Sequence, residues 1–219
     1  MRIDIAFDTV CPWCYVGKRR FDRALRMRPN LRPDIRFRSF FLNPDLPWNG
    51  IDRQVFLEKK FGSSQQYERI IETLILTGKG EGISFALDRI ERMPNSTNSH
   101  RLVRLAQSIG AQDRAVDLLF SAYFEQGRDI GDTATLISLA DEIGLEQTIV
   151  RHYLDSEDDL NSVYNENSRM HRMGVTGVPC YIFNDTKAIA GAQDPEIILR
   201  MIDMVSAQGA DLPVLQSEG

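Results

Sequence analysis

The chain has 219 residues, a formal net charge of −5 and a pI near 5.3. This acidic balance argues against a nucleic-acid partner, and no apolar run approaches the length of a membrane span. The N-terminus lacks the apolar core of a signal peptide, and three cysteines are too few for a disulfide framework. We therefore expect a cytoplasmic protein with no nucleic-acid or membrane partner, present as a monomer or a homodimer.

The first predicted elements surround a Cys-Pro-Trp-Cys segment at residues 11–14. Apolar residues alternate at Ile3, Ile5 and Phe7, which predicts a strand with these side chains on one face. Helical periodicity starts at the segment and continues to about Arg28, and its proline suits a first helical turn. The two cysteines are therefore predicted to lie where a strand ends and a helix begins.

This location favours sulfur chemistry at Cys11 and Cys14. A helix N-terminus offers unpaired N–H groups and the positive end of the helix dipole, which favour the attacking thiolate. Cys14 follows Cys11 by three residues, so their sulfur atoms share one side of the first turn and are able to bridge. We predict that Cys11 is an exposed nucleophile and that Cys14 is a more buried thiol that resolves the mixed disulfide.

A zinc site is the main structural alternative for the Cys-x-x-Cys segment. Structural zinc normally takes four ligands, and a second cysteine pair is missing. The remaining candidates are Cys180 and three histidines, none in a metal-binding spacing: His100, His152 and His171. We predict no metal and no cofactor beyond the two cysteines, with glutathione kept as an alternative.

The chain then enters a second strand and a long helical region. After a break at 29–33, residues 35–40 alternate as a strand, which is parallel to the first if the helix is a crossover. Loop 41–50 leaves the sheet, and its Trp48 is predicted to pin the loop to the core rather than to cover a pocket. No strand is expected between 51 and 167. The predicted helices there cover residues 51–61, 64–77, 98–109, 112–125, 132–143, 146–154 and 157–173.

The last part of the chain returns to sheet-like sequence. Residues 174–179 form a loop that leads into a strand at 180–183, followed by a turn and a short partner strand at 188–190. A helix is predicted from Pro195 to about Val205. The tail that follows Ala207 is predicted to fray.

This order of elements resembles the thioredoxin fold, with the helical insertion of the DsbA-like family. It is most similar to the FrnE-like branch, which is related to 2-hydroxychromene-2-carboxylate isomerases and kappa-class glutathione transferases. The predicted fold class is therefore α/β, a thioredoxin fold with a large all-helical insertion. Its parts are a thioredoxin-like domain at 1–50 and 168–207, an insertion at 51–167 and a tail at 208–219. The landmarks are the segments 11–17, 41–44, 98–102, 177–179 and 191–193.

The resemblance also implies the substrate-binding residues. It implies that the Val178–Pro179 peptide bond is cis and packs beside the cysteines, whereas an ordinary trans-proline at a strand start is the alternative. The backbone of Val178 would then contact an extended substrate. Pro12, Trp13, Val178 and Pro179 are accordingly predicted to bind substrate.

Several residues near these motifs have two interpretations each. Asp8 is expected to be exposed at the strand end, and a buried proton acceptor for Cys14 is the alternative. His100 is expected to anchor helices, and a place in the active-site pocket is the alternative. Cys180 is expected in the core, with a third redox role as the alternative. The basic cluster at 18–20 is expected on a solvated helix face.

The resulting functional prediction is a DsbA-like thiol–disulfide oxidoreductase that acts on protein or peptide thiols through Cys11 and Cys14. The alternative is a glutathione-dependent isomerase or transferase of the 2-hydroxychromene-2-carboxylate isomerase type. In those enzymes a hydroxyl residue commonly replaces the first cysteine, and Cys14 would here resolve a glutathione adduct. A third possibility is a chaperone-like module that holds hydrophobic segments with its helical insertion.

Overall fold

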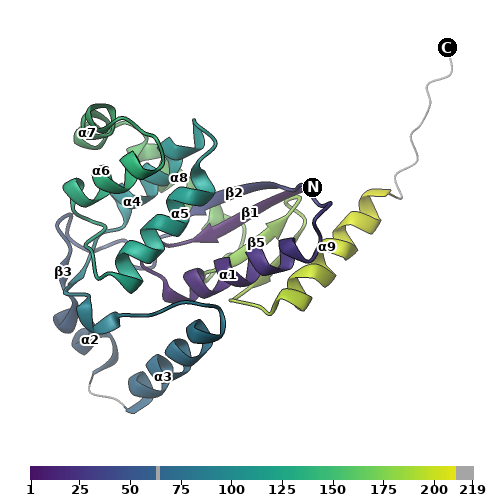
Figure 1. Cartoon of the computed structure of the whole chain (residues 1–219), viewed down its shortest axis with the longest axis horizontal. Helices are drawn as coiled ribbons and strands as arrows, with labels where there is room; N and C mark the ends of the chain where they lie inside the picture. The colour runs from purple at the N-terminus through teal and green to yellow at the C-terminus, as the bar shows by residue number, and fades with distance from the viewer. Residues whose placement is uncertain (63–64, 211–219) are drawn as a thin grey trace.

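The computed structural model describes residues 1–62 and 65–210. Its central sheet has the strand order β2-β1-β5-β6 (Figure 1). The strands are β1 (Arg2–Phe7), β2 (Asp34–Ser39), β5 (Cys180–Phe183) and β6 (Lys187–Ala190). Strands β1 and β2 are parallel and are connected through helix α1 (Pro12–Arg26), while β5 and β6 run antiparallel to their neighbours. The predicted crossover and the returning hairpin are therefore confirmed.

The alternation along β1 divides the buried residues between the two faces of the sheet. Ile3, Ile5 and Phe7 belong to the large core on the side of α1 and α9 (Pro195–Ala210). Ala6 belongs to a smaller cluster on the other side, where Met170 contributes from α8 (Leu160–Arg172). Because both faces are covered, the loop after β1 is held between layers of buried side chains.

The helices of the insertion form two groups around the end of the sheet (Figure 1). Helices α4 to α8 stack on one another and on β2, whereas α2 and α3 lie on the other side of α1. The bounds of the remaining helices are α2 (Arg53–Phe61), α3 (Gln65–Gly80), α4 (Thr97–Gln107), α5 (Gln112–Phe120), α6 (Thr133–Glu142) and α7 (Gln147–Asp155). The main core includes residues from the sheet and the insertion together, and the division into domains stays a prediction. No described helix has the length and apolar character needed to cross a membrane.

The expectation of no strand between 51 and 167 is wrong. Strand β3 (Ile51–Asp52) pairs antiparallel with β4 (Arg92–Met93), and two-residue strands are too short to show alternation in the sequence. Gly50, just before β3, lets the two strands come together, since a Cβ there would lie 2.6 Å from the Met93 carbonyl oxygen. Helix α2 consequently begins after Asp52, whose carboxylate accepts the Val55 N–H at 2.9 Å.

Two other helical predictions need adjustment at their ends. The helix predicted over 112–125 is α-helical only to Phe120 and continues as a π-helical turn at Ser121–Glu125. The last helix extends to Ala210, three residues into the predicted tail, and the rest of that tail lies outside the described residues. The helix predicted over 132–143 begins after Asp132, whose carboxylate caps it by accepting the Thr135 N–H at 2.8 Å.

A buried arginine organises the α4–α8 group. Arg101 is 1% exposed, although its guanidinium has no carboxylate partner among the described residues. It donates at 2.6–3.1 Å to the Asn98 side chain and to the backbone carbonyls of Tyr153, Leu154, Ser156 and Asp158. The guanidinium therefore satisfies the carbonyl groups left open where α7 ends, and joins that end to α4.

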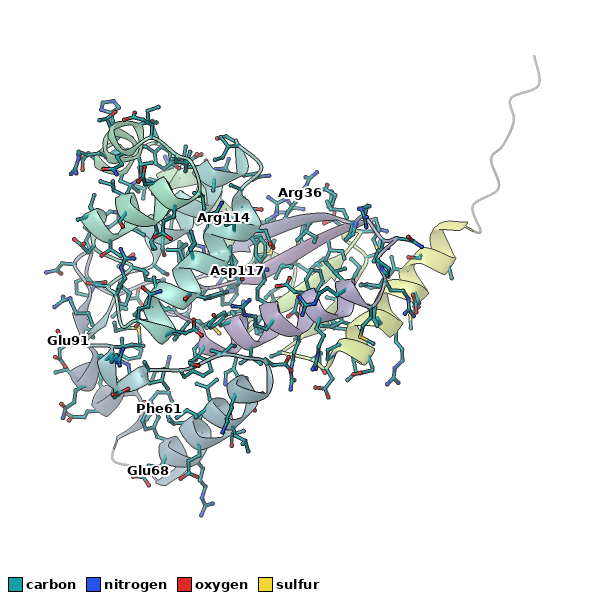
Figure 2. The ribbon with its side chains drawn as sticks, in the orientation of Figure 1. Arg36, Phe61, Glu68, Glu91, Arg114 and Asp117 are labelled. Atoms are coloured by element: carbon teal, nitrogen blue, oxygen red, sulfur yellow. The ribbon has the colours of Figure 1, made fainter. Side chains whose placement is uncertain are left out.

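A second buried charge contradicts the expectation of a solvated basic face. Lys18 is 4% exposed, and its ammonium pairs with Asp22, Asp113 and Asp117 at 2.7, 3.0 and 3.5 Å. Burial opposes the charge, but the three carboxylates outweigh it and raise the pKa of Lys18. Two of the aspartates come from α5, which packs onto α1, so a pattern along α1 alone does not reveal this cluster (Asp117 is labelled in Figure 2).

Candidate active site

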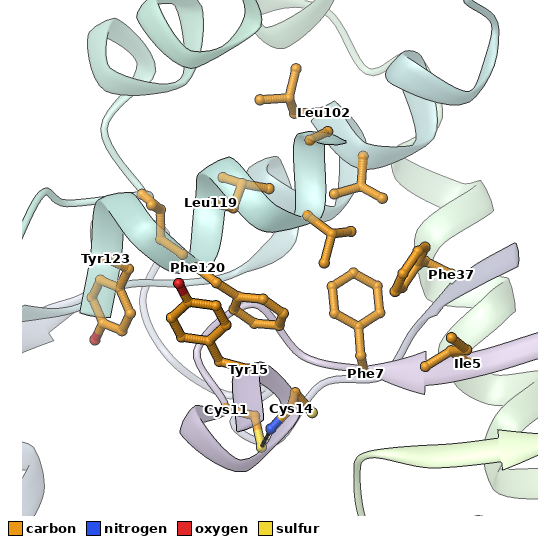
Figure 3. Packing of buried hydrophobic residues seen from close by; sticks show 14 of the residues in the cluster. Ile5, Phe7, Cys11, Cys14, Tyr15, Phe37, Leu102, Leu119, Phe120 and Tyr123 are labelled. Carbon is orange, nitrogen blue, oxygen red and sulfur yellow. Dashed lines mark hydrogen bonds between the residues drawn. The ribbon is translucent and has the colours of Figure 1, made fainter. Parts of the chain in front are cut away.

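Cys11 occupies the N-cap position of α1. Its Sγ accepts the backbone N–H of Cys14 at 3.3 Å, the bond drawn as a dashed line in Figure 3. Pro12 occupies the first helical position, where no N–H is required. Both cysteines are free thiols, and the Cys11 S–H donates weakly to the Val178 carbonyl oxygen at 3.7 Å. The predicted placement of the cysteines at a strand-to-helix junction is confirmed.

The two sulfur atoms differ in how they can be reached. Cys11 is 4% exposed and Cys14 is 2% exposed, so the prediction that Cys11 lies on open surface is wrong. Cys11 instead lines a cavity of about 290 Å³, whereas Cys14 does not line it. The order of burial is as predicted, and Cys11 is the sulfur of the pair that adjoins this cavity.

The surroundings of Cys14 keep its thiol protonated. Burial raises the pKa of Cys14 well above its ordinary value, and the hydrogen bond and charge of Cys11 act in the same direction. The backbone of Asp8 opposes this with a hydrogen bond, without reversing it. Cys14 is therefore a weak nucleophile at neutral pH.

Asp8 is fully buried, so the expectation of an exposed strand-end carboxylate is wrong. Its oxygens accept the N–H groups of Leu42 at 2.8 Å and Val10 at 3.3 Å, and one of them lies 3.3 Å from His100 Nε2. Asp8 thus joins the loop before α1 to the loop after β2 and to helix α4. Leu42 and His100 lie 34 and 92 residues from Asp8 along the chain, so the sequence pattern does not reveal the burial of Asp8.

His100 is a buried polar residue, but it anchors α4 to the loop before α1 through Asp8 rather than to another helix as expected. Its ring is 1% exposed and packs edge-on against Phe7 and Phe41, with ring centroids 5.0 and 5.2 Å away. It does not line the cavity beside Cys11. Next to it, Ser99 donates to the Ser96 carbonyl at 2.8 Å and lies 2.7 Å from the Thr9 hydroxyl. Helix α4 therefore holds the residues before Cys11 through buried polar contacts.

The Val178–Pro179 peptide bond is cis, as the resemblance implied. Gly17, on the second turn of α1, lets this loop approach the helix: a Cβ there would lie 2.8 Å from Pro179 Cγ and 2.6 Å from the Tyr181 hydroxyl. Val178 lines the cavity beside Cys11, while Pro179 is buried behind it. Of the predicted substrate-binding residues, Pro12, Trp13 and Val178 meet at the cavity and Pro179 does not line it.

The other cavity walls come from segments that the sequence did not connect with the site. Helices α2 and α3 contribute most of them, and the π-helical turn contributes Tyr123 and Phe124. Figure 2 labels Phe61, the last residue of α2, and Glu68, which lies in the first turn of α3. Trp48 is 55% exposed and lies outside this wall, so neither role considered for it is observed.

Comparison with known proteins decides the family. The DSBA-like thioredoxin domain matches residues 2–203 of the chain. The protein belongs to the DSBA-like thioredoxin family. The predicted family and fold class are thereby confirmed.

Three solved structures are similar to this DSBA-like protein over nearly its whole length. A probable DsbA oxidoreductase from Streptomyces coelicolor is 27% identical, with a TM-score of 0.87 over 100% of this chain and 95% of that one. A 2-hydroxychromene-2-carboxylate isomerase is 18% identical, with a TM-score of 0.72 and coverage of 96% and 98%. The cytosolic disulfide reductase DsbM from Pseudomonas aeruginosa, solved with glutathione, is 17% identical, with a TM-score of 0.65 and coverage of 96% and 98%.

The third cysteine of this DSBA-like protein lies away from the pair. Cys180 is 4% exposed within the smaller cluster, and burial raises the pKa of its thiol. It lines a separate cavity of about 480 Å³ on the other side of Val178. The expected core location is confirmed. Within the described ranges, no group of three or more His, Cys, Asp or Glu side chains is arranged to hold a metal ion.

Proposed function

We propose that the protein is a thiol–disulfide oxidoreductase that acts on protein or peptide thiols, with Cys11 as nucleophile and Cys14 as resolving thiol. The observation that carries this proposal is the asymmetry of the pair. Cys11 caps a helix, receives an N–H donor at 3.3 Å and faces a cavity, while Cys14 lies behind it and is held protonated. This arrangement suits exchange through a mixed disulfide.

In the reducing direction, the Cys11 thiolate attacks one sulfur of a substrate disulfide. The substrate S–S bond breaks, one substrate thiolate leaves, and a mixed disulfide with Cys11 forms. Cys14 then loses its proton and attacks the Cys11 sulfur, which expels the second substrate thiolate and closes the Cys11–Cys14 disulfide. Two electrons pass from the enzyme to the substrate, and the reverse sequence oxidises a pair of substrate thiols.

The predicted substrate-binding residues have distinct roles in this proposal. Pro12 and Trp13 border the cavity next to the reactive sulfur. Val178 places its carbonyl oxygen 3.7 Å from the Cys11 sulfur, so an extended peptide that reaches this sulfur passes beside its backbone. Pro179 supports Val178 from behind, packed against the glycine of α1.

A glutathione-dependent isomerase or transferase is the second candidate. It is supported by the fold shared with 2-hydroxychromene-2-carboxylate isomerase and with DsbM, whose structure contains glutathione. Cys14 opposes it, because a thiol behind Cys11 would displace bound glutathione. We propose glutathione as a partner in exchange, and a cytoplasmic location by analogy with cytosolic DsbM.

Insulin reduction with dithiothreitol as the reductant tests the proposal. Cys11→Ser is expected to lower the rate of insulin reduction to the uncatalysed background, whereas Cys180→Ser keeps the rate of the unmodified protein. Full activity of Cys11→Ser would refute the proposal. Turnover of an aromatic isomerase substrate with glutathione would favour the second candidate. Suppression of aggregation that survives replacement of both Cys11 and Cys14 would favour a chaperone.

A further inference from the structure

The cavity beside Cys11 carries two positive side chains on an otherwise apolar wall. Arg53 and Lys60, both on α2, line it, and none of its described lining residues is acidic. The chain as a whole has a net charge of −5, so this local balance is opposite to the overall one. Such a cavity favours an anionic group by charge complementarity.

Lys60 has no carboxylate partner in the described part of the chain. Its ammonium donates to the Asn43 side-chain oxygen at 3.3 Å and lies over the rings of Phe56 and Phe61, at 5.1 and 5.8 Å from their centroids. These neutral contacts hold the charge in place beside the cavity without neutralising it.

Arg53 is also without an ion pair among the described residues. Arg53 also lines a neighbouring shallow depression, together with three acidic residues: Glu68, Glu72 and Asp88. None of these three carboxylates forms an ion pair with the Arg53 guanidinium. Other arginines here do form such pairs, for example Arg38 with Asp4 and Arg104 with Asp159, each at 2.6 Å. The free guanidinium at the cavity is therefore available to a ligand.

The most buried part of the apolar wall and the Lys60 ammonium lie at different depths. Leu74, on α3, is 1% exposed and lies deep in the wall, together with half-buried Leu57 and Ile71. Lys60 is exposed, so its ammonium lies nearer the solvent than Leu74 does, while Arg53 is half-buried like Leu57 and Ile71. A ligand that matches both features has an apolar group beside the reacting sulfur and a negative charge further out.

We propose that the preferred substrates are peptides whose cysteine is flanked by large apolar side chains, with acidic side chains one residue beyond them. This inference rests on the proposed exchange at Cys11. An extended peptide advances about 3.3–3.6 Å per residue, so an acidic residue two positions from the cysteine can reach the outer part of the cavity. The apolar side chain fills the cavity, and the carboxylate pairs with Lys60 or Arg53.

The test uses the oxidised protein as the only oxidant. A peptide thiolate attacks Cys11 Sγ, the Cys11–Cys14 bond breaks, and Cys14 leaves as a thiolate that takes a proton. A second peptide thiolate attacks the peptide sulfur of the mixed disulfide, releasing Cys11 and forming a peptide disulfide. The reaction is followed by alkylation of free thiols and mass spectrometry at increasing peptide concentration.

Symmetric peptides remove the question of chain direction. The probes are acetylated, amidated Glu-Leu-Cys-Leu-Glu, its Lys-Leu-Cys-Leu-Lys and Gln-Leu-Cys-Leu-Gln counterparts, and Glu-Ser-Cys-Ser-Glu. Each rate constant is divided by the rate constant of the same peptide with the uncharged 2-hydroxyethyl disulfide, which corrects for its intrinsic thiol reactivity. The Glu-Leu peptide is expected to react about tenfold faster than the Lys-Leu peptide, and severalfold faster than the Glu-Ser peptide.

Variants assign the preference to the cavity. Lys60→Gln and Arg53→Gln are each expected to reduce the Glu-over-Lys preference about two- to fivefold, and the double variant to remove it. Lys59→Gln is the matched control, because Lys59 lies on the same helix but does not line the cavity, and it should keep the preference. Circular dichroism establishes that each variant is folded.

The outcomes separate this inference from the proposed function. If all four peptides react at the same corrected rate, or if Lys59→Gln loses as much preference as Lys60→Gln, the substrate assignment is wrong while exchange at Cys11 stands. If no peptide reacts with the oxidised protein, the proposed function itself fails. A preference present in the unmodified protein and lost only in the Lys60 and Arg53 variants supports the assignment.

Discussion

The two sides of the Cys11–Cys14 pair are built in opposite ways. On the α4–α8 side, buried polar side chains contact one another, as Asp8 does with His100 and Thr9 with Ser99. On the α2–α3 side, α2 has no buried residue, and apolar side chains such as Leu76 are exposed. One side fixes the geometry of the reactive segment, and the other forms the space through which Cys11 is reached. Substitutions should therefore affect stability on the first side and substrate reactivity on the second.

Arg101→Met gives the largest expected effect, and it acts on the side that fixes the geometry. Removal of the guanidinium leaves buried carbonyl groups at the end of α7 unpaired, so the free energy of unfolding should fall by about 3–5 kcal/mol. Urea denaturation measures it. The control Arg169→Met removes an exposed ion pair and should change stability by less than about 1 kcal/mol. Equal losses in both variants would contradict this role of Arg101.

Lys18→Met should have the next largest effect. It leaves the carboxylates of Asp22, Asp113 and Asp117 close together without a counter-charge, and should lower the free energy of unfolding by about 2–4 kcal/mol. The same urea titrations measure it. The exposed Lys59, changed to Met, should cost less than about 0.5 kcal/mol. A Lys18 variant as stable as the unmodified protein would show that the cluster does not join α1 to α5.

The raised pKa of Cys14 predicts a pH dependence of the resolving step. Burial is the largest cause of the raised pKa, and it persists in the mixed disulfide. The fraction of Cys14 present as the attacking thiolate therefore rises about tenfold per pH unit, and this rise continues beyond the ordinary thiol pKa of about 8.5. Stopped-flow release of the second substrate thiol should rise about 30-fold between pH 7.0 and 8.5. A rate that levels off below pH 8 would contradict a thiol held protonated.

The raised pKa of Cys14 also makes the stability of the fold depend on pH, and stability falls as the pH rises. A pKa that is higher in the folded state means that folding is favoured while Cys14 is protonated. This contribution is fully present below the unfolded thiol pKa and is lost as the pH rises through the raised value. The Cys14→Ser variant should therefore lose less stability between pH 8 and 10 than the unmodified protein does.

Ile70→Ser gives the smallest expected effect and sharpens the comparison from the other side. Ile70 lines the cavity and is 38% exposed, so its loss should cost less than about 1 kcal/mol of stability. The rate constant with the Glu-Leu-Cys-Leu-Glu peptide should fall about three- to fivefold, while the Glu-Ser-Cys-Ser-Glu rate is unchanged. Leu76→Ser, on the same helix but outside the cavity, is the control and should change neither rate.

The sequence was sufficient where local patterns determine the structure. The alternation of Ile3, Ile5 and Phe7, followed at once by a Cys-x-x-Cys helix start, predicted the crossover and the cysteine positions. The cis bond before Pro179 followed from family resemblance, because an X–Pro pair in sequence permits both isomers.

Other features depend on elements distant in the chain, which periodicity does not bring together. The burial of Asp8 results from Leu42 and His100, and that of Lys18 from the aspartates of α5. The cavity beside Cys11 likewise required the packing of α2 and α3, whose own patterns predicted helices but not the wall that they form.

Trapping of the mixed disulfide tests the central claim most directly. The reduced Cys14→Ser variant is mixed with the disulfide-linked dimer of the Glu-Leu-Cys-Leu-Glu peptide, digested without reductant and mapped by mass spectrometry. The asymmetry of the pair predicts one peptide attached to Cys11 in a stable adduct, and no adduct at Cys14 in the Cys11→Ser variant. An adduct at Cys180 in place of Cys11, or rapid adduct formation at Cys14 when Cys11 is absent, would contradict the account.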